Sequence, residues 1–184
     1  GPCGADSFGA LQSPDANGLQ LPPGFSSRVV ATSNQSVGGS SYTWHSSPDG
    51  GASFATGDGG WVYVSNSETG GTSGGVGALR FDAGGNLIDA YAILAGTSTN
   101  CAGGPTPWGS WLSCEEVNDG QVYECDPFIP SQGVVRAALG TFRHEAAAVD
   151  PIRQQIYLTE DAPNGLLYRS TPNPYPKLDT GLLE

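Results

Sequence analysis

The chain has 184 residues, of which 28 are glycine and 14 are proline. It carries 18 acidic against 7 basic side chains, which gives a formal net charge of -11. This balance argues against a nucleic-acid partner, because neutralising phosphates requires a basic face, whereas it permits the binding of cations.

The composition also bears on the cellular compartment. No apolar run approaches the roughly 18 residues that a membrane span needs, so we expect no membrane span. Glycine, serine, threonine and asparagine are abundant, lysine is scarce, and the four cysteines are an even number. These features favour a protein exported to an oxidising compartment, either secreted or periplasmic.

Short strands separated by turns are predicted along most of the chain. Residues 1–27 contain four prolines and read as an extended amino-terminal arm. Apolar or alternating runs then predict strands at residues 28–32, 61–65, 76–82, 87–94, 111–114, 121–125, 134–139, 146–149, 156–159 and 166–170. No segment has a convincing helical pattern, so the predicted class is all-β. We assign residues 28–176 to the β domain and 177–184 to a tail that leads to a missing or separate part.

One unit occurs three times in this series of strands. It consists of an apolar strand that ends in an acidic residue, a loop containing glycine, and a second apolar strand. The copies begin at Trp61, Trp111 and Ile156, which are about 45 to 50 residues apart, the size of a β-propeller blade. The sequence therefore predicts a β-propeller, and a partial one with about three to four blades.

A propeller would also bring the acidic residues at the strand ends close together. Equivalent strands of successive blades point toward one central channel, so these side chains are expected to converge there and to require cations. They are Glu68, Glu115, Glu116, Glu160 and Asp161. A partial propeller would also leave a strand edge unpaired, which predicts a companion chain or self-association.

Two runs of the sequence resemble a known family. CAGGPTPWGSWLSCEE at residues 101–116 and GTFRHEAAAVDP at residues 140–151 are similar to motifs of the PhoX-type alkaline phosphatases. These are secreted β-propeller enzymes that use iron and calcium. A looser match lies at residues 60–68, where Ser67 stands in place of a histidine of the family motif. The resemblance covers roughly residues 45–176.

The resemblance implies a metal-dependent phosphomonoesterase that hydrolyses phosphate esters outside the cytoplasm. It implies Ca²⁺ as a cofactor, and Fe³⁺ if Cys114 is a thiolate. The implied metal ligands are Cys114, Glu115, Glu116, Glu145, Glu160, Asp161 and Glu68, and the implied catalytic residues are His144, Glu145 and Arg143. The alternative is a non-catalytic, calcium-stabilised propeller module with a binding or assembly role.

Several of these residues have a second interpretation that the sequence leaves open. Cys114 is either an iron ligand or the disulfide partner of Cys101, since both flank one turn. His144 is either catalytic or hydrogen-bonded to a neighbouring blade, and the pair at residues 160–161 is either a ligand pair or a solvated turn. Cys3 and Cys125 have no other evident role, and we expect them to form a disulfide.

Overall fold

The computed structural model describes residues 8–130 and 133–184, and these residues form three antiparallel sheets of four strands each. The first sheet contains β1 (Pro48–Ala55), β2 (Trp61–Ser67), β3 (Gly74–Phe81) and β4 (Leu87–Thr97). The second contains β5 (Asn100–Pro105), β6 (Trp111–Glu115), β7 (Val122–Cys125) and β8 (Val134–Val135). The third contains β9 (His144–Asp150), β10 (Gln155–Glu160), β11 (Leu167–Pro172) and β12 (Gly181–Leu183).

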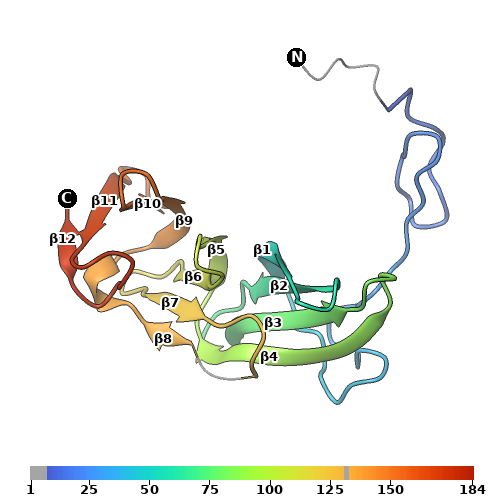
Figure 1. Ribbon diagram of the computed structural model, residues 1–184, viewed down its shortest axis with the longest axis horizontal. Helices are drawn as coiled ribbons and strands as arrows, with labels where there is room; N and C mark the ends of the chain where they lie inside the picture. Colours follow the sequence, from blue (N-terminus) through green and yellow to red (C-terminus); the bar gives the residue numbers. More distant parts are fainter. Residues whose placement is uncertain (1–7, 131–132) are drawn as a thin grey trace.

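In each sheet the strands pair in chain order, as in the blades of a propeller. The three sheets fan out side by side, with β1, β5 and β9 on the concave side of the arc (Figure 1). The only helical segment of the described residues is a 3₁₀ turn at Ala137–Leu139. The structure therefore confirms the predicted all-β class and blade arrangement, with three blades.

The predicted strands differ from the observed ones mainly where glycine or proline is frequent. Three strands were not predicted, β1, β5 and β12, and each is rich in glycine or lies beside prolines. Conversely, residues 28–32 form no strand. The predicted strand at 134–139 is divided into β8 and the 3₁₀ turn. The last blade also extends past residue 176, where the predicted β domain ends, because β12 pairs with β11.

Apolar side chains fill the spaces between adjacent blades. Val62 and Val64 of β2 are fully buried in one cluster with Trp111 of the second blade. Ile156 and Leu158 of β10 are buried with Leu112 in the next cluster. Alternate residues of each strand face opposite sides of its sheet, so these apolar residues at every second position bind the blades into one body.

The inner strands approach one another so closely that two positions require glycine. A Cβ on Gly50 of β1 would lie 2.7 Å from the Cα of Ala102 in β5. A Cβ on Gly104 of β5 would lie 1.8 Å from the carbonyl oxygen of Ala147 in β9. The absence of side chains here brings the backbones of β1, β5 and β9 together, and with them the residues that these strands carry.

The amino-terminal segment lies outside the three sheets. Residues 8–27 contain no helix or strand, and Figure 1 shows this segment extending away from the blades. Farther along, Val37 and Trp44 are buried against Leu79 and Phe81, so the segment before β1 covers the outer face of the first blade. Cys3 lies outside the described residues, and the Cys3–Cys125 disulfide stays a prediction.

Candidate metal centre

A two-residue bulge occurs near the start of the inner strand of every blade. In the first blade Asp49 and Gly50 lie opposite the single residue Asn66. In the second, residues 101–102 lie opposite Cys114, and in the third, residues 145–146 lie opposite Thr159. A bulge interrupts the ladder and redirects side chains. The first residue of each bulge is a potential metal ligand, namely Asp49, Cys101 and Glu145.

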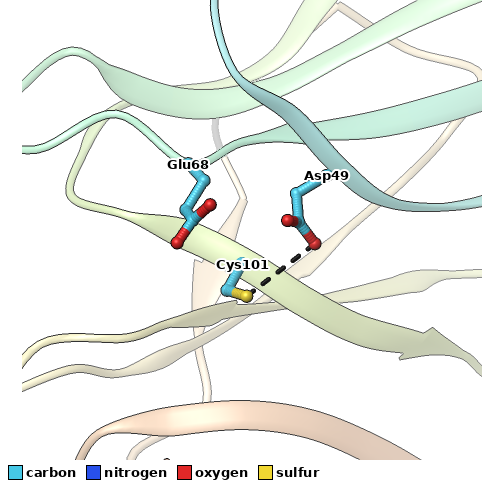
Figure 2. A group of neighbouring side chains, drawn as sticks. All are labelled: Asp49, Glu68 and Cys101. Atoms are coloured by element: carbon cyan, nitrogen blue, oxygen red, sulfur yellow. Dashed lines mark hydrogen bonds between the residues drawn. The ribbon is translucent and has the colours of Figure 1, made fainter.

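Acidic residues at the ends of the second strands complete the group. Glu68 follows β2 and Glu116 follows β6, beside the start of the inner strand of the same blade. Asp49, Glu68 and Cys101 offer ligand atoms within 4.8 Å of one another, and their side chains converge in Figure 2. Cys101, Glu116 and Glu145 form a second such group. Because both groups share Cys101, the five side chains make one continuous cluster at the inner strands.

The cluster concentrates negative charge, and the pKa values of two of its carboxyl groups are raised. Desolvation raises the pKa of Glu68, and the charges of Asp49 and Glu116 raise it further. Desolvation likewise raises the pKa of Glu145, and the charges of Glu116, Asp161 and Asp49 add to this effect. A cation among these groups would relieve the repulsion that both shifts reflect.

Cys101 is the central residue of the cluster. Its sulfur lies 3.4 Å from Glu145 Oε1 and 3.7 Å from Asp49 Oδ1, so its single S–H proton can be donated to either carboxylate. Burial raises the pKa of this thiol far above its usual range, and the bond to Glu145 and the neighbouring carboxylates raise it further. Without a bound cation the sulfur therefore keeps its proton, since deprotonation would add one more negative charge to the group.

Arg143 brings positive charge to the edge of the cluster. Its guanidinium donates a hydrogen bond to Glu116 Oε1, and its side chain is 41% exposed. Its carbonyl oxygen accepts a bond of 3.1 Å from the backbone N–H of Asp161, whose charge also acts on Arg143 and Glu145. The predicted residues Arg143 and Asp161 thus lie beside the cluster.

Two of the predicted ligands, Glu115 and Glu160, accept hydrogen bonds within their own hairpins and belong to neither ligand group. Glu115 accepts bonds from the backbone N–H groups of Ser98, at 2.8 Å, and Gln121, at 3.1 Å. Glu160 accepts bonds of 3.2 Å from the N–H of Leu166 and the hydroxyl of Tyr168. Adjacent residues at a strand end point to opposite sides. The first acid of each pair therefore closes its hairpin, and the second is free to face the centre or its edge.

Cys114 and His144 belong to neither of the two ligand groups. Cys114 is a free thiol, fully buried with Leu112 and Val122 in the core between the second and third blades. Cys101 is a free thiol as well, so the considered Cys101–Cys114 disulfide is not formed. The cysteine of this motif that lies in the cluster is Cys101, at the other end of the motif from Cys114.

His144 precedes Glu145 in β9 and points the opposite way, into the core. It is fully buried, its ring lies 3.7 Å from the ring of Phe142, and its Nε2 lies 3.3 Å from the carbonyl oxygen of Gly140. The partner is a residue just before β9 and not one of a neighbouring blade, and the catalytic role of His144 stays a prediction. Burial lowers the pKa of His144 to about 4.

This lowered pKa predicts a loss of stability in acid. Between pH 6.5 and about 4 the unfolded chain binds a proton at residue 144 and the folded chain does not, so the free energy of unfolding falls as the pH falls. Its contribution is up to about 3 kcal/mol over this range. Urea unfolding of His144→Leu at several pH values should show a shallower acid limb than the wild type. An acid limb as steep as that of the wild type would contradict this role of His144. His45→Gln should likewise make the limb shallower, since burial also lowers the pKa of His45 to about 4.

The donor set fits the cations that the sequence implied. Carboxylate oxygens are the preferred ligands of hard cations such as Ca²⁺. A thiolate favours a transition-metal ion, and the cluster offers one thiol among four carboxyl groups. Asp49 and Cys101 were not predicted as ligands. Both precede a small residue, as Glu145 does, and that shared pattern could have identified them.

Comparison with known proteins places the fold and the motifs in one family. The family model for alkaline phosphatase PhoX matches residues 67–180. The structure of Pseudomonas fluorescens PhoX in complex with vanadate, a transition-state analogue, is similar with a TM-score of 0.61 and 19% sequence identity. The alignment covers 75% of this chain and 45% of that one, so this chain spans less than half the length of that protein.

No curated protein matches the chain. No helix within the described ranges is long and apolar enough to cross a membrane. The comparisons give no support to the predicted companion chain, and self-association stays a prediction. Because the family model covers more than half of the sequence, the chain belongs to the PhoX alkaline phosphatase family.

Proposed function

We propose that this chain supplies the metal-binding blades of a phosphomonoesterase that acts on phosphate esters outside the cytoplasm. The observation that carries the proposal is the convergence of carboxyl groups and one thiol from three blades, at equivalent strand positions. Membership of the PhoX family supports the reaction class. A relative that binds vanadate as a transition-state analogue supports a site for a phosphoryl group.

In this proposal the residues of the cluster hold the cations. Asp49, Glu68, Glu116 and Glu145 would supply oxygen ligands for Ca²⁺, and Cys101 would supply a sulfur ligand for iron. When bound, the cations neutralise phosphoryl oxygens and lower the pKa of water. The protein itself fixes the spacing of the ligands through the three bulges and limits access of water at the buried side of Cys101.

Arg143 has the clearest role toward the substrate in this proposal. Its guanidinium lies at the cluster edge and is partly exposed, which suits a bidentate contact with phosphate oxygens. A cation at Glu116 would compete with Arg143 for that carboxylate and leave the guanidinium available to an anionic substrate. Arg143 would thus orient the phosphate ester and stabilise its charge.

The test is hydrolysis of p-nitrophenyl phosphate at alkaline pH by protein loaded with Ca²⁺ and iron. We expect Glu116→Gln to reduce kcat/KM by about 100-fold or more, because charge stabilisation by a metal site is worth several kcal/mol. Glu115→Gln is the matched control, since the Glu115 carboxylate accepts hydrogen bonds from two backbone N–H groups and belongs to neither ligand group. Equal activity of the two variants would contradict the assignment.

The non-catalytic calcium module remains the second candidate. Two observations favour it: His144 is buried away from the cluster, and the chain spans only part of its solved relative. If the metal-loaded chain binds Ca²⁺ by titration calorimetry but hydrolyses no phosphomonoester, this second function is correct and the enzymatic one is wrong.

A further inference from the structure

Asn66 connects the first blade to the bulge that carries Cys101. It is fully buried near the end of β2, opposite the bulge of its own blade. Its Nδ2 donates hydrogen bonds to the carbonyl oxygens of Cys101, at 3.0 Å, and Ala102, at 2.7 Å. Its Oδ1 accepts bonds of 2.9 Å from Trp111 Nε1 and from the hydroxyl of Ser113.

These four bonds use the full capacity of the amide and fix its orientation. A carbonyl oxygen only accepts and an indole N–H only donates, so the nitrogen must face β5 and the oxygen must face β6. A flipped amide would place oxygen against two carbonyl oxygens inside a buried site. The amide therefore has a single favourable position.

The bonds also answer a local need of the bulge. The β5–β6 register passes from Asn100 directly to Gly103, so Cys101 and Ala102 lie where the ladder is interrupted. Buried carbonyl oxygens without partners cost free energy, and the Asn66 amide supplies both partners from the neighbouring blade. Asn100, which precedes Cys101, joins the same network through a bond of 2.9 Å from its Nδ2 to Ser113 Oγ.

We propose that Asn66 is a positioning residue for the metal centre: its amide holds the β5 bulge in the shape that points the Cys101 sulfur at the carboxyl groups of the cluster. Asn66 is not a ligand in this proposal and acts only through Cys101. The inference rests on the proposed metal centre. It goes beyond it by assigning the position of the sulfur to a side chain of another blade.

The test uses Cd²⁺ as a probe, because its thiolate complexes have an ultraviolet charge-transfer band that reports the metal–sulfur bond directly. In Asn66→Asp a carboxyl oxygen replaces the nitrogen that faces the two carbonyl groups. We expect this variant to bind Cd²⁺ at least about tenfold more weakly, as second-shell changes commonly do, and to lose the thiolate band at saturating Cd²⁺. Cys101→Ser provides the spectrum without the sulfur.

Trp111→Phe is the matched control. It removes a donor from the other end of the same buried amide and leaves both bonds to the bulge in place. We expect it to lower the melting temperature but to keep the thiolate band and to change Cd²⁺ affinity by less than about threefold. If Asn66→Asp does not fold, Asn66→Ala is used, which removes the donors without adding repulsion and should also weaken the band.

The outcomes distinguish the positioning role of Asn66 from the metal centre on which it depends. A full thiolate band in the folded Asn66 variant, or equal Cd²⁺ affinities of the Asn66 and Trp111 variants, overturns the positioning role and leaves the metal centre intact. A wild-type spectrum identical to that of Cys101→Ser overturns the ligand role of Cys101 and the positioning role together, and absence of any Cd²⁺ binding to the wild type overturns the metal centre itself.

Discussion

Replacing Gly104 with alanine is expected to destabilise the chain by about 4 kcal/mol or more, among the largest effects of a single methyl group. The new Cβ would lie 1.8 Å from the Ala147 carbonyl oxygen, which belongs to the backbone of the adjacent blade. Neither partner can move by a side-chain rotation, so β5 and β9 must separate. Because these strands carry Cys101 and Glu145, the variant should also lose metal affinity.

Chemical unfolding of Gly104→Ala beside Gly57→Ala measures this effect. Gly57 has no atom within 4 Å of an added Cβ and no left-handed backbone, so its substitution is expected to change stability by less than about 0.5 kcal/mol. If the two variants unfold at the same denaturant concentration, the inner strands are not packed as closely as described.

The sequence predicted the second and third strands of the blades well, and the physical reason is their burial pattern. The apolar alternation that marks β2, β6 and β10 is the same pattern that fills the spaces between blades. The repeat of these strands was enough to predict three copies of one unit and hence the propeller. The inner strands β1 and β5 show no such pattern, because glycines at the closest backbone approach replace the apolar side chains.

The site was predicted in part for the same reason. Glu68, Glu116 and Glu145 were expected at the centre and lie there, because they follow or begin strands that the pattern located. Asp49 and Cys101 lie in bulges of strands that were not predicted, and a bulge changes which side a residue faces without being visible in the apolar alternation used to locate strands. Glu115 and Glu160 were assigned as ligands because a pair of acids in sequence does not show which one closes the hairpin.

Removing bound cations is expected to produce the second large effect. In the proposed metal centre, Ca²⁺ at a free concentration about 1,000 times its dissociation constant stabilises the folded chain by about 4 kcal/mol, because it binds the folded state alone. Chelation should therefore lower the melting temperature markedly, and added Ca²⁺ should restore it. A melting temperature that does not respond to either treatment, with no calcium found by elemental measurement, would exclude a cation site in this cluster.

Glu145→Gln tests the same site through a gain in the stability of the metal-free chain, which a merely destabilising substitution would not produce. The folded chain raises the pKa of Glu145 through desolvation and neighbouring carboxylates, so keeping this group ionised at neutral pH costs stability when no cation is bound. The folded state binds the proton more tightly than the unfolded state, and this penalty grows as the pH rises through the folded-state pKa. Neutral glutamine removes the penalty.

We therefore expect chelated Glu145→Gln to melt at a higher temperature than the chelated wild type at pH 7, while gaining less from added Ca²⁺. Glu115→Gln, one position from the cluster ligand Glu116, should show the opposite behaviour. Its amide has one acceptor oxygen for the N–H groups of Ser98 and Gln121, so one of the two bonds is lost and an NH₂ group faces the other N–H. The variant should be less stable than the wild type with or without Ca²⁺ and gain as much from the ion. If Glu145→Gln is destabilised under chelation and responds fully to Ca²⁺, Glu145 does not face the cations.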